Sequence, residues 1–241
     1  MHSAPPVRLE LTAALPQIAR VYARSGRVHI AHALSNESAY RAYRSLAEEV
    51  PWQLHLNDGD CAFDIGGDQV RAMPESTQAQ LYARVNANAA SGFQYLFDNF
   101  PLSDAHALGR NLELYAMRVF EFVNSPEFLE FARRVVGDER IAFADAQATR
   151  YRSGHFLTQH DDALEARERI AAYVLNLTPE WRADWGGILN FLDGDGHVAE
   201  GYTPVFNALN LFKVPQPHAV SYVTPFAKGA RYSISGWLRS T

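Results

Sequence analysis

Three residues in the C-terminal half of the chain have the types and spacing of a metal site. His160 and Asp162 lie two positions apart in the predicted strand that ends the segment YRSGHFLTQHDD. Alternate strand residues share a face, so both side chains can reach one point while Asp161 points away. His218 opens another predicted strand and is the best candidate for a third ligand. Two histidines and one carboxylate that leave metal positions open are typical of non-haem Fe(II) oxygenases.

A second group of polar residues lies in the segment RYSISGWL near the C-terminus. Strand alternation places four of its side chains on one face: Arg231, Ser233, Ser235 and Trp237. An inward-facing guanidinium needs an anionic partner, and its planar fork binds a carboxylate through two hydrogen bonds. A metal beside such an arginine would suit a dicarboxylate such as 2-oxoglutarate. The alternative, from these residues alone, is an exposed strand arginine that pairs with surface acids.

The elements that must position these residues change character along the chain. Up to residue 137 the spacing predicts helices, over 10–24, 36–49, 76–95 and 106–124, with a short strand at 27–31. Ser125 and Pro126 predict the start of one more helix. From residue 138 onward, short β-rich segments follow: 140–151, 155–160, 170–177, 187–192, 208–214, 218–223 and 231–238. This order predicts an α+β fold whose β part is a sandwich or barrel, in a single domain over 1–241.

Composition narrows the class of protein further. The 241 residues are 47% hydrophobic and carry 22 basic against 27 acidic side chains, a net charge of −5. This balance argues against a general nucleic-acid binder. No apolar run approaches the roughly 18 residues of a membrane span, and the N-terminal segment has no apolar signal region. Cys61 is the single cysteine, so an internal disulfide is excluded. We expect a cytoplasmic protein with no membrane partner and leave its oligomeric state open.

Residues 151–239 resemble the prolyl-hydroxylase branch of the Fe(II)/2-oxoglutarate-dependent oxygenases. The matching pieces follow one another in the family's order: YRSGHFLTQHDD, YVLNLTPEW, WGGILNF, PVFNALNLFKV, PHAVSYV and RYSISGWLR. Within the branch, HDD, LTPEW and SISGWL are most similar to the ribosomal-protein prolyl hydroxylases and their bacterial relatives. The resemblance implies a double-stranded β-helix, or jelly roll, over 138–241, supported by the mostly helical part at 1–137.

The resemblance also implies a role for each candidate site residue. The implied iron ligands are His160, Asp162 and His218. The implied 2-oxoglutarate-binding residues are Arg231, Tyr151, Asn176 and Ser235, and Trp237 is assigned to the substrate pocket. Arg231 matches the basic residue that holds the distal carboxylate of 2-oxoglutarate. Asn176 is a departure, because many relatives have a cosubstrate-binding tyrosine at this position.

The implied reaction is hydroxylation of a substrate carbon, coupled to oxidation of 2-oxoglutarate by O₂ to succinate and CO₂. Fe(II) is the expected metal and ascorbate the expected reductant. The predicted substrate is a prolyl residue in a protein, with a ribosomal or translation protein as the narrower expectation. One alternative is a hydroxylase of a small molecule or free amino acid. Others are a catalytically silent jelly roll that acts as a binding module, and a zinc hydrolase, which would leave Arg231 and Tyr151 unexplained.

Overall fold

The structure is a computed structural model that describes residues 6–11, 14–59, 61–163 and 168–240. Its helices are α1 (Leu15–Ser25), α2 (Asn36–Arg44), α3 (Gly67–Ala72), α4 (Glu75–Ala89), α5 (Leu102–Ala107), α6 (Tyr115–Val123) and α7 (Pro126–Val136), with a π-helical turn at Ser45–Glu49 and a 3₁₀ turn at Ala183–Trp185. Its strands are β1 (Arg27–Ala31), β2 (Gln53–Asp58), β3 (Cys61–Gly66), β4 (Tyr95–Phe100), β5 (Phe143–Ala144), β6 (Gln147–Tyr151), β7 (Phe156–His160), β8 (Arg169–Asn176), β9 (Leu189–Leu192), β10 (Val198–Tyr202), β11 (Ala208–Lys213), β12 (His218–Val220) and β13 (Arg231–Arg239).

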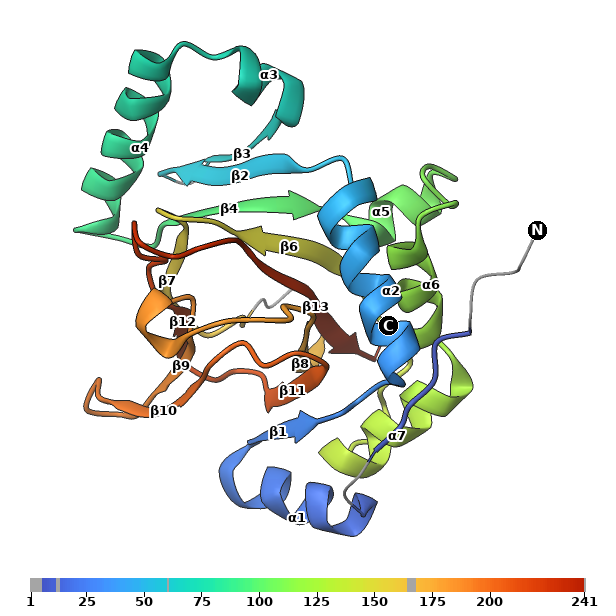
Figure 1. The fold of residues 1–241 in the computed structure, drawn as a ribbon. Coiled ribbons are helices and arrows are strands. Elements are labelled where there is room, and N and C mark those ends of the chain that lie inside the picture. The colour runs from blue at the N-terminus through green and yellow to red at the C-terminus, as the bar shows by residue number, and fades with distance from the viewer. Residues whose placement is uncertain (1–5, 12–13, 60, 164–167, 241) are drawn as a thin grey trace.

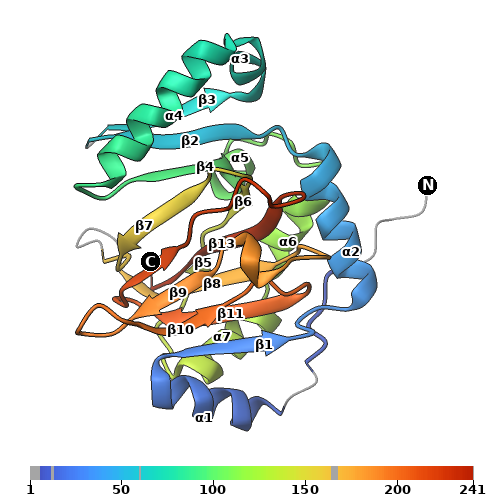
Figure 2. The same ribbon diagram turned by 60° about the vertical axis from the view of Figure 1, so that its left-hand side comes forward.

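The strands form one strongly curled antiparallel sheet (Figure 1). Its order is β1-β11-β8-β13-β6-β4-β7-β12-β9-β10, with β2 and β3 added beyond β4 and β5 beside β13. The part β7-β12-β9-β10 folds back over β8 and β13, so that the sheet is a nearly closed barrel (Figure 2). The predicted fold class, an α+β protein with a jelly roll and supporting N-terminal helices, is confirmed.

The helices support the barrel by covering the outer face of its larger sheet. Buried side chains of α6 and α7 pack with those of β8 and β13 in one core, where the Phe128 ring lies edge-on to Tyr173 at 6.1 Å. The predicted start of α7 is confirmed, because the Ser125 side chain accepts a hydrogen bond from the Phe128 N–H at 3.2 Å. Among the described residues, no helix has the length and apolarity that crossing a membrane requires.

The N-terminal half contains strands that the helical interpretation did not predict. The segments 53–58 and 61–66 form the β2–β3 hairpin, and the end of the predicted helix at 76–95 belongs to β4. α4 ends at Ala89, and Tyr95 already pairs with Leu157 of β7. Pairing of β4 with β6 and β7 therefore overrides local helical propensity, which is a weak constraint on short segments.

The predicted helix over 106–124 is interrupted. α5 ends at Ala107 and α6 begins at Tyr115. Between them Gly109 and Asn111 have left-handed φ angles of 65° and 53°, which end a right-handed helix. Leu108 and Leu112 lie in this break and are exposed, whereas Leu114 and most apolar side chains of α6 are buried.

The turn that precedes β9 depends on Gly186. Its φ of 73° and ψ of −148° lie in a region open to glycine alone, and a Cβ would lie 2.0 Å from the Tyr222 carbonyl oxygen. We expect Gly186→Ala to lower the free energy of unfolding by at least about 2 kcal/mol, measured by denaturant titration. Gly194→Ala is the control, since its Cβ would meet no atom within 4 Å. Equal stabilities of the two variants would contradict this account of the turn.

Candidate metal centre and adjoining cavity

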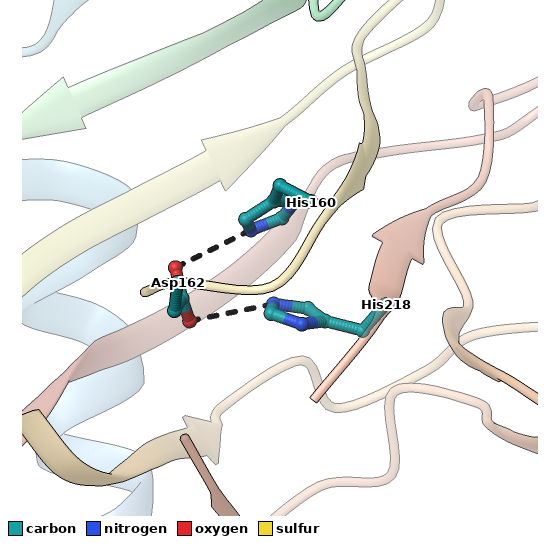
Figure 3. A group of neighbouring side chains, drawn as sticks. All are labelled: His160, Asp162 and His218. Carbon is teal, nitrogen blue, oxygen red and sulfur yellow. Dashed lines mark ion pairs between the residues drawn. The ribbon is translucent and has the colours of Figure 1, made fainter. Parts of the chain in front are cut away.

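The antiparallel pairing of β7 with β12 brings the two predicted histidine ligands together. His160 ends β7, His218 begins β12, and the two are direct partners in the register. Both imidazoles point toward the Asp162 carboxylate (Figure 3), with His160 Nε2 at 3.4 Å from Oδ1 and His218 Nε2 at 3.5 Å from Oδ2. One ligand atom from each residue lies within 4.8 Å of the others. The set offers two nitrogens and one anionic oxygen to a single ion.

Asp162 reaches this point by a turn rather than by strand alternation. β7 ends at His160, and Asp162 has a left-handed φ of 65°. Asp161 is exposed, and its Oδ1 accepts a hydrogen bond from the Ala163 N–H at 2.9 Å. Asp162 therefore points inward and Asp161 outward, as expected, but the cause is the left-handed backbone at Asp162 and not strand alternation.

The backbone orients both imidazole rings for metal binding. His160 Nδ1 lies 2.9 Å from the Thr158 carbonyl oxygen, and His218 Nδ1 lies 2.7 Å from that of Gln216. A carbonyl only accepts hydrogen bonds, so each Nδ1 carries the proton and each Nε2 keeps its lone pair. Such hydrogen bonds fix the tautomer and the orientation of metal-binding histidines.

Electrostatics favour the protonation states that a metal requires at Asp162 and His218. Burial raises the pKa of Asp162, but hydrogen bonds and the neighbouring histidines outweigh it and hold the pKa below its usual value. Burial, together with the charge of His160, lowers the pKa of His218 to about 4. Metal binding needs a carboxylate and neutral imidazoles, so little proton competition is expected at Asp162 and His218 at neutral pH.

Arg169, the first residue of β8, contacts Asp162 and helps to position its carboxylate. Its Nη1 donates to the Asp162 carbonyl oxygen at 3.0 Å and lies 3.9 Å from Oδ1 of the same residue. Its guanidinium Cζ lies 3.5 Å from the centroid of the Trp237 ring. The side chain is 7% exposed. Sequence reasoning missed this residue, because nothing in its local sequence context marks an arginine at the start of a strand as a partner of Asp162.

Removing this support should weaken metal binding without unfolding the protein. We expect Arg169→Ala to lower Mn(II) affinity by about tenfold or more, the range found when groups that orient metal ligands are lost. Arg169→Lys keeps the charge without the planar fork and should restore part of the affinity. Electron paramagnetic resonance of free Mn(II) measures both. Arg140→Ala is the control, because Arg140 is an exposed arginine paired with Asp138; an equal effect in both variants would rule out a positioning role for Arg169.

One cavity joins this cluster to the second predicted group. Its lining includes the three ligands together with Tyr151, Arg231, Ser235 and Trp237. Arg231 is 2% exposed, and its Nε and Nη1 have no hydrogen-bond partner among the described residues. Its Cζ lies 5.0 Å from the centroid of the Tyr151 ring, its neighbour in the β13–β6 register. Burial lowers the pKa of Arg231 and raises that of Tyr151.

An unpaired buried guanidinium is costly, and it therefore points to an anionic ligand in the same cavity. Other polar side chains in the lining come from β6 and β13, among them Thr149 and Ser233, whose hydroxyl oxygens lie 2.7 Å apart. The alternating face of β13 predicted from sequence lies along the cavity. The donor set and the buried arginine together fit a metal with a bound dicarboxylate.

Asn176 occupies a different position from the other predicted cosubstrate residues. It is 1% exposed, and its Nδ2 donates to the Ala208 carbonyl oxygen at 3.4 Å. Strand alternation puts it on the same face as Val174, which lines the cavity, but Asn176 is absent from the described lining residues. Its predicted contact with 2-oxoglutarate stays a prediction.

A jelly roll that carries two histidines and a carboxylate beside a buried arginine defines the class of non-haem iron oxygenases. Comparison with protein families agrees, because residues 146–239 match the 2OG-Fe(II) oxygenase superfamily. The match covers the β-rich C-terminal part of the chain, which holds both groups of site residues.

Named relatives show what the chain is similar to. It is 35% identical to mouse "Prolyl 3-hydroxylase OGFOD1" and 31% identical to the protein of that name from Xenopus laevis, over 118 residues in each case. These alignments cover 46% of this chain and 21% and 22% of the two relatives. The chain thus matches about a fifth of the length of these curated relatives.

Solved structures support the fold. A 2OG-Fe(II) oxygenase family oxidoreductase from Burkholderia pseudomallei aligns with a TM-score of 0.60 at 12% identity, over 99% of this chain and 96% of that one. A Trichoplax adhaerens prolyl hydroxylase, solved with a hypoxia inducible factor peptide fragment, aligns with a TM-score of 0.60 at 15% identity, over 94% and 89%. At these identities the likeness concerns the fold alone.

Proposed function

We propose that this protein is an Fe(II)- and 2-oxoglutarate-dependent dioxygenase that hydroxylates a prolyl residue in a protein. The observation that carries the proposal is one cavity lined both by the two histidines and the carboxylate and by the buried Arg231, whose Nε and Nη1 have no hydrogen-bond partner among the described residues. Neither a zinc hydrolase nor a silent binding module explains both features. The superfamily match over 146–239 supports the same reaction class.

Each residue of the cavity has a task in this proposal. His160, Asp162 and His218 would hold Fe(II), leaving positions for 2-oxoglutarate and O₂. Bound there, the metal supplies the oxidising chemistry that couples 2-oxoglutarate decarboxylation to hydroxylation. Arg231 would pair with the distal carboxylate through its fork, and the Tyr151 hydroxyl, kept protonated by burial, could donate to it. Ser235 and Trp237 would border the cosubstrate and the substrate carbon.

The prolyl-protein substrate is supported by the named relatives. Two are prolyl 3-hydroxylases by name, and a structural neighbour was solved with a peptide fragment. A ribosomal or translation protein is the narrower proposal, which rests on the sequence resemblance. A small-molecule hydroxylase would use the same iron site and is the second candidate. A cytoplasmic location, ascorbate as reductant and a single domain over 1–241 stay predictions.

Comparative mass spectrometry of the proteome tests the substrate. Cells that express the wild-type chain are compared with cells that express Asp162→Ala, and peptides are searched for a gain of one oxygen on proline. The proposal expects at least one prolyl site that is oxidised only with the wild type. Succinate formation by the purified wild-type enzyme together with an oxidised small molecule, and no such site, would favour the second candidate instead.

A further inference from the structure

An aromatic stripe leads from the metal cluster to the surface. Phe93 is 50% exposed, and its ring centroid lies 5.6 Å from that of His160. Tyr95 lies 5.7 Å from Phe93, and Phe97 lies 5.7 Å from Tyr95. Phe97 lines the cavity and stacks on Tyr151 at 5.1 Å. We call Phe93, Tyr95 and Phe97 the aromatic rim.

The segment that carries Phe93 is held by buried hydrogen bonds. Asn57 Nδ2 donates to the Phe93 carbonyl oxygen at 3.0 Å, and Asn57 Oδ1 accepts from the Tyr95 N–H at 2.9 Å. Gln94 exchanges two bonds with Thr158, at 2.8 and 3.0 Å. Asn57 and Gln94 are 5% and 1% exposed. The backbone that carries the half-exposed ring is therefore held in place, unlike that of a loose surface loop.

The same network ties the rim to the metal centre. Thr158 bonds to Gln94 through its N–H and its hydroxyl, and the carbonyl oxygen of the same residue orients the His160 ring. β4, which follows Phe93, pairs directly with β7. The strand β7, which carries the proposed ligand His160, thus also positions Phe93. Phe93 is the exposed end of the row of aromatic rings that ends at Phe97 in the cavity lining.

The length of the rim favours an extended peptide over a single small ligand. Phe97 is 5% exposed, so a ligand at the surface follows the step of 5.7 Å from Phe93 to Tyr95. This step corresponds to roughly two residues of a polyproline II segment, which rises about 3.1 Å per residue. Proline-containing extended segments dock on aromatic-lined surfaces, because the prolyl ring packs flat and the chain loses little entropy. A free amino acid in the cavity would leave Phe93 uncovered.

We propose that the aromatic rim is the docking surface for an extended, proline-containing segment of the protein substrate, with Phe93 as a specificity-determining residue. The proposal rests on the proposed function. In it, residues that flank the target proline pack along Phe93 and Tyr95 while the target reaches the metal. The rim then contributes to peptide affinity and contributes nothing to the binding of metal or 2-oxoglutarate.

The test uses a synthetic library of short peptides, each with one central proline, and the full-length chain. The peptide that the wild type hydroxylates best is measured for kcat/KM and for affinity to protein loaded with Mn(II) and 2-oxoglutarate, where no turnover occurs. Phe93→Ala should lower both by about tenfold or more, with KM raised more than kcat is lowered. Phe93→Tyr keeps the ring and should retain most of both. Mn(II) affinity, 2-oxoglutarate affinity and the unfolding temperature should not change.

Tyr40→Ala is the matched control. Tyr40 is 52% exposed and belongs to α2. The helix α2 lies on the side of the molecule away from β7 and β12 (Figures 1 and 2). Its loss should leave peptide affinity as in the wild type. If the wild type hydroxylates the peptide and Phe93→Ala binds it with unchanged affinity, the docking proposal is overturned and the proposed function stands. A wild type that hydroxylates no prolyl peptide of the library, yet forms succinate, would overturn the prolyl substrate and the docking proposal with it.

Discussion

Replacing Asp162 with alanine is expected to abolish Fe(II)-dependent formation of succinate from 2-oxoglutarate. The variant loses the single anionic ligand of the cluster and leaves two histidine rings 4.1 Å apart with no counter-charge for a divalent ion. Mn(II) binding should fall below detection, a larger loss than that caused by removing a supporting group. His160→Ala and His218→Ala should behave in the same way. Succinate is measured in the purified protein by mass spectrometry.

Asp161→Ala provides the control for this experiment. Asp161 has the same charge and is the adjacent residue, but it is exposed and its carboxylate accepts a hydrogen bond from the Ala163 N–H. Activity and Mn(II) affinity should stay within about twofold of the wild type, as for a surface substitution. An inactive Asp161→Ala beside an active Asp162→Ala would show that the metal ligands are assigned wrongly.

Arg231→Ala is expected to weaken 2-oxoglutarate binding by at least about tenfold. Hydrogen bonds between charged groups contribute roughly 1.5–3 kcal/mol each, and 1.4 kcal/mol corresponds to a factor of ten in affinity. Arg231→Lys should recover only part of the loss, since lysine keeps the charge but cannot form the planar pair of bonds. Titration of 2-oxoglutarate into the Mn(II)-loaded protein gives the affinities.

Mn(II) affinity itself should change little in Arg231→Ala. Among the described residues, the Arg231 guanidinium forms no hydrogen bond or ion pair with His160, Asp162 or His218. Arg182→Ala, which removes an exposed arginine paired with Asp184, controls for a general charge effect. Unchanged 2-oxoglutarate affinity in Arg231→Ala would remove the cosubstrate role of Arg231 and the main argument against a generic metal-binding jelly roll.

The pair of His160 and Asp162 and the side chains of β13 that line the cavity were predictable, because the residues of each group lie close together in the sequence. Arg231 to Trp237 alternate along one strand, so strand periodicity groups their side chains. His160 and Asp162 are only two residues apart, which predicted that they converge, although β7 ends at His160. The turn at Asp162 shows the limit of this reasoning. Its left-handed φ comes from the end of β7, which no pattern of apolar residues marks.

Contacts between distant segments were not predictable in the same way. Arg169 reaches the ring of Trp237 because β8 and β13 are neighbours. Phe93 lies at the rim only because β4 pairs with β7. The β2–β3 hairpin and β4 were missed for a related reason, since their stability comes from pairing within the sheet. A single sequence indicates the local propensity of each segment but not which strands pair, and contacts between paired strands override local propensity.

The most direct test of the account is the metal dependence of 2-oxoglutarate binding, measured by calorimetric titration with and without Mn(II). If the cluster and Arg231 hold the two ends of one molecule, affinity for 2-oxoglutarate should rise by at least about tenfold with Mn(II). Glutarate, which lacks the 2-oxo group needed for chelation, should bind with the same low affinity in both conditions. Equal 2-oxoglutarate affinities with and without Mn(II), or no binding at all, would contradict the assignment of this cavity to a metal and its cosubstrate.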